Sequence, residues 1–246
     1  MTHLLLINPN TTASMTASIA EAARAVAAPN TRIDARQPSF GPASIEGHFD
    51  EAIASAGVAE QVRLADPAPD AVVIACFGDP GLDAAREACA APVLGIAEAA
   101  FHAAAMLATG FSVVTTMTRT CAIAERLVQR YGFERACRGI HGTDIPVLAL
   151  ETDAGAQAQI EAACRAALER DRSGAIVLGC AGMARLTHAL QARLGVPVVD
   201  GVAAAVKFAE ALAALGLRTS KHGDYAAPLP KRYEGWAAAL VWPSGG

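Results

Sequence analysis

The chain has 246 residues, of which 53% are apolar, and its 24 acidic and 20 basic side chains give a net charge of −4. This apolar content excludes a disordered chain, and a chain without a basic block is not expected to bind nucleic acid. The mean hydropathy is +0.31, but charged residues such as Glu98 and Lys207 interrupt the most apolar windows, so we expect no membrane span.

The cellular setting is predicted from the N-terminus and the cysteines. The N-terminus lacks a positively charged start and turns polar at Asn8, so we do not expect a signal peptide. Six cysteines without short regular spacing do not predict a disulfide framework in a chain of this length. We therefore expect a cytoplasmic protein with free thiols.

The first half of the chain predicts strands that alternate with helices. In order, these are a strand at His3–Ile7, a helix from Met15 to Val26, a strand around Ile33, a helix at Phe49–Leu64, a strand from Ala71, a helix after Asp79 and Pro80, a strand at Val93–Ile96 and a helix at Ala97–Ala108. Asp79 followed by Pro80 is a favourable N-cap and first-turn pair. The stretch Gln37–Gly47, rich in Pro, Gly and Ser, predicts a long loop, and such loops often carry function.

The second half predicts the same alternation. Its elements are a strand at Phe111–Thr116, a helix through Ile123 and Tyr131, a short strand near Val147, a helix around Ile160 and Leu168, a strand before Cys180, a further helix, a strand after Pro197 and an alanine-rich helix. The tail Thr219–Gly246 has no clear period. It holds Pro228, Pro230, Tyr233, Trp236 and Trp242, and we interpret it as an arm packed on its own subunit or on a neighbour.

The two halves repeat one another. Ala71–Gly78 reads AVVIACFG and Ala175–Gly182 reads AIVLGCAG, and the two cysteines are 180 − 76 = 104 residues apart. The prolines before the next strands, Pro92 and Pro197, are 197 − 92 = 105 residues apart. The pattern predicts two similar α/β lobes with mainly parallel sheets, related by a pseudo-twofold axis, with the active site between them. Residues 1–96 and 203–246 are expected to form the first lobe, and residues 97–202 the second.

Cys76 and Cys180 each end a predicted core strand in front of a helix start. Backbone N–H groups and the helix dipole at such a place favour a thiolate, so we expect a lowered thiol pKa. The other four cysteines fit ordinary core positions. Neither cysteine has the neighbouring ligands of a metal site, a Cys-x-x-Cys motif or an adjacent histidine base, so we expect no metal site, no redox dithiol and no Cys–His nucleophile.

Two identical groups on opposite sides of a pocket suit proton transfer at a stereocentre. One group removes the proton from one face, and the other returns a proton to the opposite face. The N–H groups of Phe77, Gly78, Ala181 and Gly182 are candidates to stabilise the enolate. Asn8 and Asn10 end the first strand, and Thr115 and Thr116 end its counterpart, so these four are candidate substrate-binding residues. Glu46 and His48, at the end of the long loop and the start of the next helix, are two further candidates to reach the pocket, although we favour their interpretation as a solvated helix lead-in.

These residues together resemble the aspartate/glutamate/hydantoin racemase superfamily, in particular its hydantoin and allantoin racemase branch. The matching phrases are INPNT at residues 7–11, GPASIEG at 41–47 with FDE at 49–51, ACFGDPG at 75–81, LGCAGM at 178–183 and TSK at 219–221. The resemblance implies a cofactor-independent racemase with Cys76 and Cys180 as acid and base, Ile45 among the substrate-binding residues, and a homo-oligomer. The amino-acid racemase branch tends to have Asp where this chain has Asn8, and ionisable or polar residues after each cysteine. The neutral surroundings here therefore favour a 5-substituted hydantoin, allantoin included.

Two alternatives remain open at this point. The first is a cis-trans isomerase of the maleate type or a decarboxylase of the arylmalonate type, on the same fold. A diacid substrate would call for anion-binding groups, and no arginine lies beside either cysteine. The second alternative is a non-catalytic small-molecule binding protein whose cysteines only pack.

Overall fold

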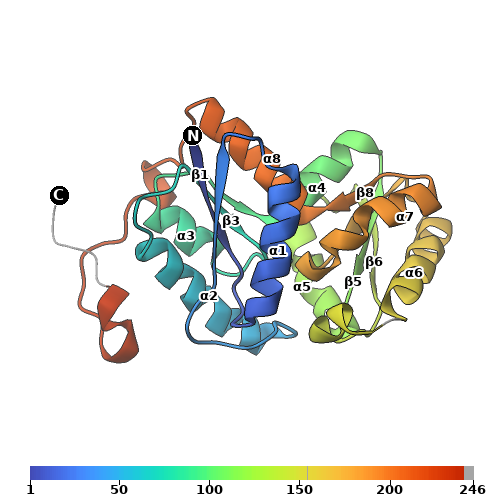
Figure 1. Ribbon diagram of the computed structural model, residues 1–246, viewed down its shortest axis with the longest axis horizontal. Helices are drawn as coiled ribbons and strands as arrows, with labels where there is room; N and C mark the ends of the chain where they lie inside the picture. The colour runs from blue at the N-terminus through green and yellow to red at the C-terminus, as the bar shows by residue number, and fades with distance from the viewer. Residues whose placement is uncertain (154, 241–246) are drawn as a thin grey trace.

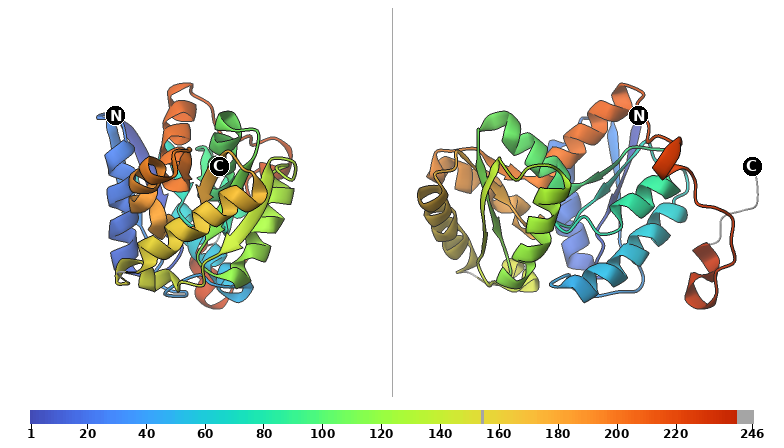
Figure 2. Two further views of the ribbon diagram at one scale, coloured as in Figure 1. Left: turned by 90° about the vertical axis from the view of Figure 1, so that its right-hand side faces the viewer. Right: turned by 180° about the vertical axis from the view of Figure 1, so that it is seen from behind.

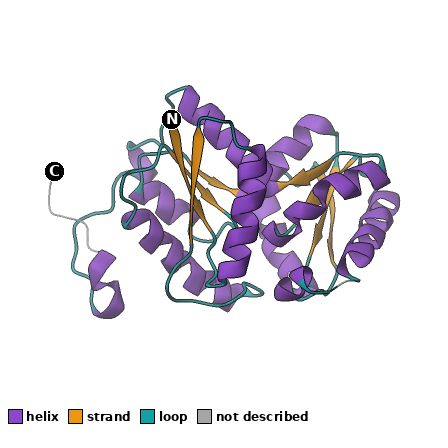
Figure 3. Cartoon of the chain, in the orientation of Figure 1, coloured by secondary structure: helices purple, strands orange, loops and turns teal. Residues whose placement is uncertain are grey.

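The computed structural model describes residues 1–153 and 155–240. Its strands form two four-stranded parallel sheets with helices on both faces (Figures 1 and 3). The strand orders, β2-β1-β3-β4 and β6-β5-β7-β8, are equivalent. The predicted pair of similar α/β lobes with parallel sheets is therefore confirmed.

Each lobe is built from alternating strands and helices. The elements of the first half are β1 (Thr2–Ile7), α1 (Ala13–Val26), β2 (Thr31–Arg36), α2 (His48–Arg63), β3 (Ala71–Ile74), α3 (Leu82–Ala88), β4 (Val93–Gly95) and α4 (Ile96–Leu107). Those of the second half are β5 (Phe111–Thr115), α5 (Cys121–Arg130), β6 (Cys137–Gly142), α6 (Ala156–Asp171), β7 (Ala175–Leu178), α7 (Thr187–Leu194), β8 (Val198–Asp200) and α8 (Gly201–Ala214).

The strands before the two cysteines are buried throughout. All four residues of β3 and of β7 are buried, and each strand is paired on both sides. Such short runs of β-branched and small apolar residues are typical of parallel strands covered by helices on both faces.

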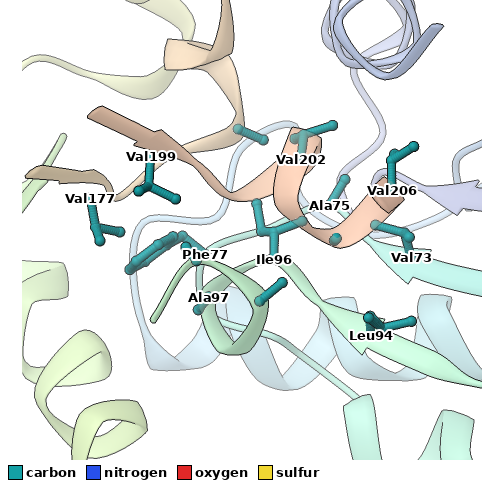
Figure 4. Close-up of a cluster of buried hydrophobic side chains, with 14 of the residues drawn as sticks. Val73, Ala75, Phe77, Leu94, Ile96, Ala97, Val177, Val199, Val202 and Val206 are labelled. Carbon is teal, nitrogen blue, oxygen red and sulfur yellow. The ribbon is translucent and has the colours of Figure 1, made fainter. Parts of the chain in front are cut away.

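Helices α4 and α8 join the two lobes into one core. Helix α8 packs on β3, β4 and α1 of the first half, whereas α4 packs on β7 and β8 of the second half, and the two helices contact each other. Figure 4 shows Val202 and Val206 of α8 next to Ile96 of α4 and Val73 of β3. The two helix starts meet closely, because a Cβ on Gly201 would lie 2.4 Å from the carbonyl oxygen of Ile96.

Two local predictions are wrong. The strand expected near Val147 is a 3₁₀ helix at Val147–Glu151, and the edge strand of the second sheet is β6, ten residues earlier. Strand β6 contains two glycines and an arginine, so its sequence lacks the apolar alternation of a strand. The helix expected directly after Asp79 and Pro80 is α3, which begins at Leu82 with Gly81 as its N-cap.

The tail leaves the first lobe as an arm. Lys221 Nζ donates to the carbonyl oxygens of Arg86 and Glu87 on α3, and the ring centroids of Trp236 and Phe40 lie 5.1 Å apart. Figures 1 and 2 show the short helical segment at Gly235–Leu240 at the outer side of the first lobe, on the far side from the second lobe. Trp242 lies outside the described residues. Within the described part of the chain, no helix combines the length and the apolar character that crossing a membrane requires.

Candidate active site

One pocket lies at the carboxyl ends of the central strands, where ligands bind in parallel α/β sheets. Its lining is drawn from both halves: Asn10, Met15, Ile45, Glu51, Ala75, Cys76, Phe77, Gly78, Thr115, Thr116, Thr120, Ile123, Ala124, Val147, Gly179, Cys180 and Ala181. The volume of this cavity that is open to water molecules is about 60 Å³. A space of this size suits a small ring better than a large ligand.

Equivalent backbone geometry delivers the two cysteines to this pocket. Strands β3 and β7 continue through Ala75 and Gly179, whose N–H groups donate to the carbonyl oxygens of Ile7 and Val114 at 2.8 Å each. A tight turn follows each cysteine. In the first turn the Asp79 N–H donates to the Cys76 carbonyl at 3.0 Å, and in the second the Met183 N–H donates to the Cys180 carbonyl at 3.0 Å. Both thiols therefore face one shared cavity.

The expectation of lowered thiol pKa values is wrong. Burial raises the pKa of Cys76 to about 12, and the charges of Cys180, Asp79 and Glu51 act in the same direction. Burial likewise raises the pKa of Cys180 to about 11. The N–H groups of Gly78 and Gly182 face the sulfurs and oppose these shifts without offsetting them. One physical reason is that α3 begins only at Leu82, so no helix start lies directly behind Cys76.

The two asparagines at the end of β1 have different roles. Asn10 lines the pocket, whereas Asn8 does not. Asn8 Nδ2 donates to Asn10 Oδ1 at 2.9 Å and to Thr16 Oγ1 at 2.9 Å. Asn10 Oδ1 also accepts from the Thr12 N–H at 2.9 Å, and Asn10 Nδ2 lies 3.5 Å from the Met15 sulfur. Asn8 thus orients Asn10, whose amide N–H₂ group donates to Met15 and has a second N–H for a ligand.

The threonines at the end of β5 both line the pocket. Thr115 Oγ1 donates to the Gly179 carbonyl at 2.8 Å, so this hydroxyl can only accept from a ligand. Thr115 and Gly179 also pack closely against each other, because a Cβ on Gly179 would lie 2.6 Å from the Thr115 Cβ. Glycine before Cys180 therefore lets Thr115 reach the cavity.

Of the remaining residues predicted to bind substrate, four line the pocket and one does not. Phe77, Gly78 and Ala181 line the pocket, and Ile45 reaches it from the long loop. Gly182 does not line it, but the Gly182 N–H faces the Cys180 sulfur.

The pocket contains lining residues that the sequence did not single out. Met15, Thr120, Ile123, Ala124 and Val147 contribute apolar and hydroxyl surface, and Glu51 contributes a carboxylate. Glu51 has a side chain that is 13% exposed and accepts from Arg126 Nη2 through both oxygens, at 2.7 and 2.8 Å. Its place in the first turn of α2 matches a favourable helix-dipole position, so the sequence carried no separate sign of its role in the site.

The lining is poor in charge. Among its residues, Glu51 is the one carboxylate, and no lysine, arginine or histidine is present. Within the described residues, no group of three or more His, Cys, Asp or Glu side chains is placed to hold a metal ion. The pocket can therefore offer two thiols, amide and hydroxyl groups, and backbone N–H groups to a ligand.

Comparisons with known proteins show which proteins this chain is similar to. The sequence profile described as Asp/Glu/Hydantoin racemase matches residues 4–209. A hydantoin racemase of Rhizobium meliloti is 48% identical over 235 residues, which cover 95% of this chain and 98% of that protein. The structure of an allantoin racemase from Klebsiella pneumoniae is 56% identical, with a TM-score of 0.96, and 98% of this chain and 99% of that chain are covered.

A second allantoin racemase structure, from Pseudomonas fluorescens, is 42% identical with a TM-score of 0.92, covering 95% of this chain and all of that chain. Structures of arylmalonate decarboxylase and of a maleate isomerase from Pseudomonas putida share the fold alone, at 22% and 20% identity with TM-scores of 0.61 and 0.65. The profile match and the high identity over nearly the full length show that this chain belongs to the Asp/Glu/Hydantoin racemase family.

Proposed function

We propose that this chain is a cofactor-independent racemase of 5-substituted hydantoins, with allantoin among its substrates. The proposal depends on one observation above all, which is that Cys76 and Cys180 come from equivalent strand ends and line a single pocket. The hydantoin and allantoin racemases that this chain resembles support the choice of substrate.

The reaction needs one thiolate and one thiol. The thiolate removes the proton from C5 of the ring, and the thiol on the opposite face then delivers its proton to C5. In the reverse direction the two sulfurs exchange roles, so each cysteine serves one enantiomer as the base. The high pKa of both thiols keeps the second sulfur protonated and ready to donate.

The intermediate is an enolate whose oxygen needs hydrogen-bond donors. We assign this role to the N–H groups of Phe77 and Ala181 together with the amide of Asn10. The N–H groups of Gly78 and Gly182 already face the sulfurs, so in this scheme they stabilise whichever thiolate is present.

The substrate class follows from the lining. A diacid such as maleate or an arylmalonate carries charges that call for cationic partners, and the lining holds none. A hydantoin is a neutral ring whose amide N–H and C=O groups match Asn10, the threonine hydroxyls and the backbone. The chemistry of the pocket therefore favours a racemase over the isomerase and decarboxylase alternatives.

Several broader features belong to the same proposal. We assign the first lobe to residues 1–96 and 203–246 and the second to residues 97–202. We also propose that the protein is cytoplasmic and works as a homo-oligomer. We assign the contact with a second copy to the arm that carries Trp236, whose side chain is 67% exposed.

The test uses pure enantiomers of allantoin, 5-benzylhydantoin and 5-isobutylhydantoin, followed by polarimetry and by exchange of the C5 proton in deuterated water. We expect the wild-type protein to racemise at least one of them, and Cys76→Ser and Cys180→Ser each to abolish racemisation. Each serine variant should still exchange the enantiomer whose proton faces the remaining thiol. Cys89→Ser, at a half-buried position outside the pocket, is the matched control and should keep full activity.

Racemisation that survives in both single serine variants would contradict the two-thiol mechanism. Turnover of maleate or an arylmalonate, with all hydantoins inert, would favour the alternative activities. Binding of hydantoins without turnover would favour a binding protein.

A further inference from the structure

The starts of α4 and α8 are equivalent in the duplicated halves, but their N–H groups are capped from different places. In α8 the cap is local: Asp200 accepts from the N–H groups of Val202 and Ala203 at 3.1 and 2.9 Å. The equivalent N–H groups in α4 are those of Ala97 and Glu98, since 202 − 97 and 203 − 98 both equal 105.

The position equivalent to Asp200 in the first half is Gly95, since 200 − 95 = 105, and glycine has no side chain to cap with. The cap comes instead from Asp79, whose two carboxylate oxygens accept from the Ala97 and Glu98 N–H groups at 3.0 Å each. This carboxylate fills the space that a side chain at position 95 would need, because a Cβ on Gly95 would lie 2.2 Å from the Asp79 Cγ. The carboxylate that caps α4 therefore belongs to the turn that carries Cys76, whereas the carboxylate that caps α8 belongs to the residue directly before that helix.

Asp79 also reaches the second half of the chain. Its Oδ2 accepts from the Tyr131 hydroxyl, directly after α5, at 2.9 Å. Asp79 is 4% exposed and has a φ of +44°, a left-handed conformation that Asp, Asn and Gly adopt more readily than other residues. In the other half, position 183 is the counterpart of position 79 (183 − 79 = 104), and it holds Met183, which is fully buried. The turn at Cys180 is therefore anchored by apolar packing, and the turn at Cys76 by a buried carboxylate.

We propose that Asp79 is a positioning residue for Cys76, because its carboxylate ties the Cys76 turn to α4 and α5 and so holds this thiol facing Cys180. Asp79 does not line the pocket, so it acts through Cys76 and not on the substrate. Its own N–H group donates to the Cys76 carbonyl, which makes the connection between carboxylate and thiol short and stiff. The catalytic consequence of this alignment depends on the proposed function, whereas the tie itself does not.

The first test measures the alkylation rate of each cysteine by mass spectrometry of its peptide, in wild type and in Asp79→Asn. Asparagine keeps the left-handed turn but removes the charge and exchanges one acceptor for a donor. We expect Cys76 to be alkylated about tenfold faster, because a loosened turn exposes its buried sulfur to the reagent, while the rate of Cys180 stays unchanged. Unchanged alkylation of Cys76 would overturn the proposal even if no hydantoin proves to be a substrate.

The second test separates positioning from helix capping by exchanging the two residues, in Asp79→Gly/Gly95→Asp. This variant places a carboxylate at the position from which Asp200 caps α8, but it no longer ties α4 to the Cys76 turn. Gly95 and Asp200 have similar backbone angles, with φ of −87° and −93°, so the new aspartate fits the local conformation. We expect the exchange to restore the Tm that Asp79→Gly lowers, and to leave Cys76 alkylation fast. Recovery of the wild-type alkylation rate would show that Asp79 acts only as a helix cap, and would overturn its role in positioning Cys76.

The activity readout is C5 proton exchange for each enantiomer taken separately, with Cys76→Ser and Cys180→Ser identifying which enantiomer faces which thiol. Asp79→Asn should slow exchange of the Cys76-facing enantiomer by about tenfold to a hundredfold, the range expected for a misplaced reacting group. Exchange of the other enantiomer should stay near the wild-type rate. Asp200→Asn is the matched control, since it weakens the equivalent cap by exchanging one acceptor oxygen for a donor but is not tied to the Cys76 turn. Equal slowing of both enantiomers in Asp79→Asn, or the same selective slowing in Asp200→Asn, would overturn the positioning role.

Discussion

The side chain of Glu46 accepts a hydrogen bond from the backbone N–H of Val147 at 3.0 Å, which fastens the long loop of the first half to the second half. Ile45 and Val147 both line the pocket, so this bond lies at the edge of the cavity. The loop is also held three residues earlier by Thr12, whose hydroxyl donates to the Ala43 carbonyl at 2.7 Å. The interpretation of Glu46 as a solvated helix lead-in is therefore wrong, because its carboxylate holds the loop over the pocket.

Replacing Glu46 by alanine should open this loop. Losing a hydrogen bond to a charged acceptor costs about 1–3 kcal/mol, so we expect KM for the hydantoin to rise about tenfold with a smaller change in kcat. Glu46→Gln keeps an acceptor oxygen and is the control, with KM expected to stay close to that of the wild type. Steady-state kinetics on both variants would decide, and an unchanged KM in Glu46→Ala would show that the loop closes without this bond.

The pH dependence of activity should follow the raised thiol pKa values. With values of about 12 and about 11 for Cys76 and Cys180, the fraction of enzyme with one thiolate is small at neutral pH and grows with pH. We expect kcat/KM to rise roughly tenfold per pH unit between about pH 7 and 9. The apparent pKa values of this profile belong to the coupled pair of thiols and not to either cysteine alone. The Cys76→Ser/Cys180→Ser double variant supplies the background of uncatalysed racemisation. A profile that is already flat in this range would mean that the thiols ionise below neutral pH.

The buried carboxyl of Asp79 should make stability depend on pH. Burial raises the pKa of Asp79 to about 6 from 3.8, although the Ala97 and Glu98 N–H groups act in the opposite direction. Because the folded-state pKa is the higher one, this stabilising contribution is complete below about pH 4 and is lost as the pH rises through about 6. The loss amounts to about 3 kcal/mol at most.

Urea unfolding of wild type and Asp79→Asn at several pH values would isolate this contribution. We expect the free energy of unfolding of the wild type to fall relative to that of the variant between about pH 4 and 7. Asp34→Asn should show the opposite sign at lower pH, where the wild type loses stability relative to this variant as the pH falls below about 4. Burial acts to raise the pKa of Asp34, but its contacts with Arg36 and His3 outweigh burial and lower it. A difference between wild type and Asp79→Asn that does not vary with pH would contradict the raised pKa of Asp79.

The close contact beneath Cys180 predicts a strong effect of Gly179→Ala. The added Cβ would lie 2.6 Å from the Thr115 Cβ, so the strand end must move. Overpacking of this kind costs about 1–3 kcal/mol, and we expect kcat to fall as Thr115 and Cys180 are displaced. Gly155→Ala is the control, because its nearest neighbour would be the Asp153 carboxylate oxygen at 3.3 Å. Unfolding and racemisation assays on both variants test this expectation, which fails if the two behave alike.

The sequence predicted those features that repeat within it. The duplicated phrases at Cys76 and Cys180 predicted the two parallel sheets and the shared position of the thiols, since buried parallel strands have a recognisable composition. Strand β6 was missed because it lies at a sheet edge, and its pattern is set by contacts with β5 and not by its own alternation.

The rest of the site depends on contacts between residues far apart in the chain. Glu51 is an ordinary first-turn acid in the sequence, and only the fold brings it to the pocket beside Arg126. Asp79 matched a local cap, but the actual partners of its carboxylate lie 18, 19 and 52 residues away. The thiol pKa values were mispredicted because burial, which the sequence does not quantify, outweighs the nearby N–H groups.

The meeting of Ile96 and Gly201 at the starts of α4 and α8 has a consequence for how such a duplicated molecule can be built. These two positions are counterparts, since 201 − 96 = 105, so in a symmetric pair of identical half-chains both would hold the same residue. Two isoleucines would collide there, and two glycines would leave a gap in the core. A single covalent chain can place a large residue opposite a small one, so the two halves pack more closely at this point than two half-chains with the same residue at both positions.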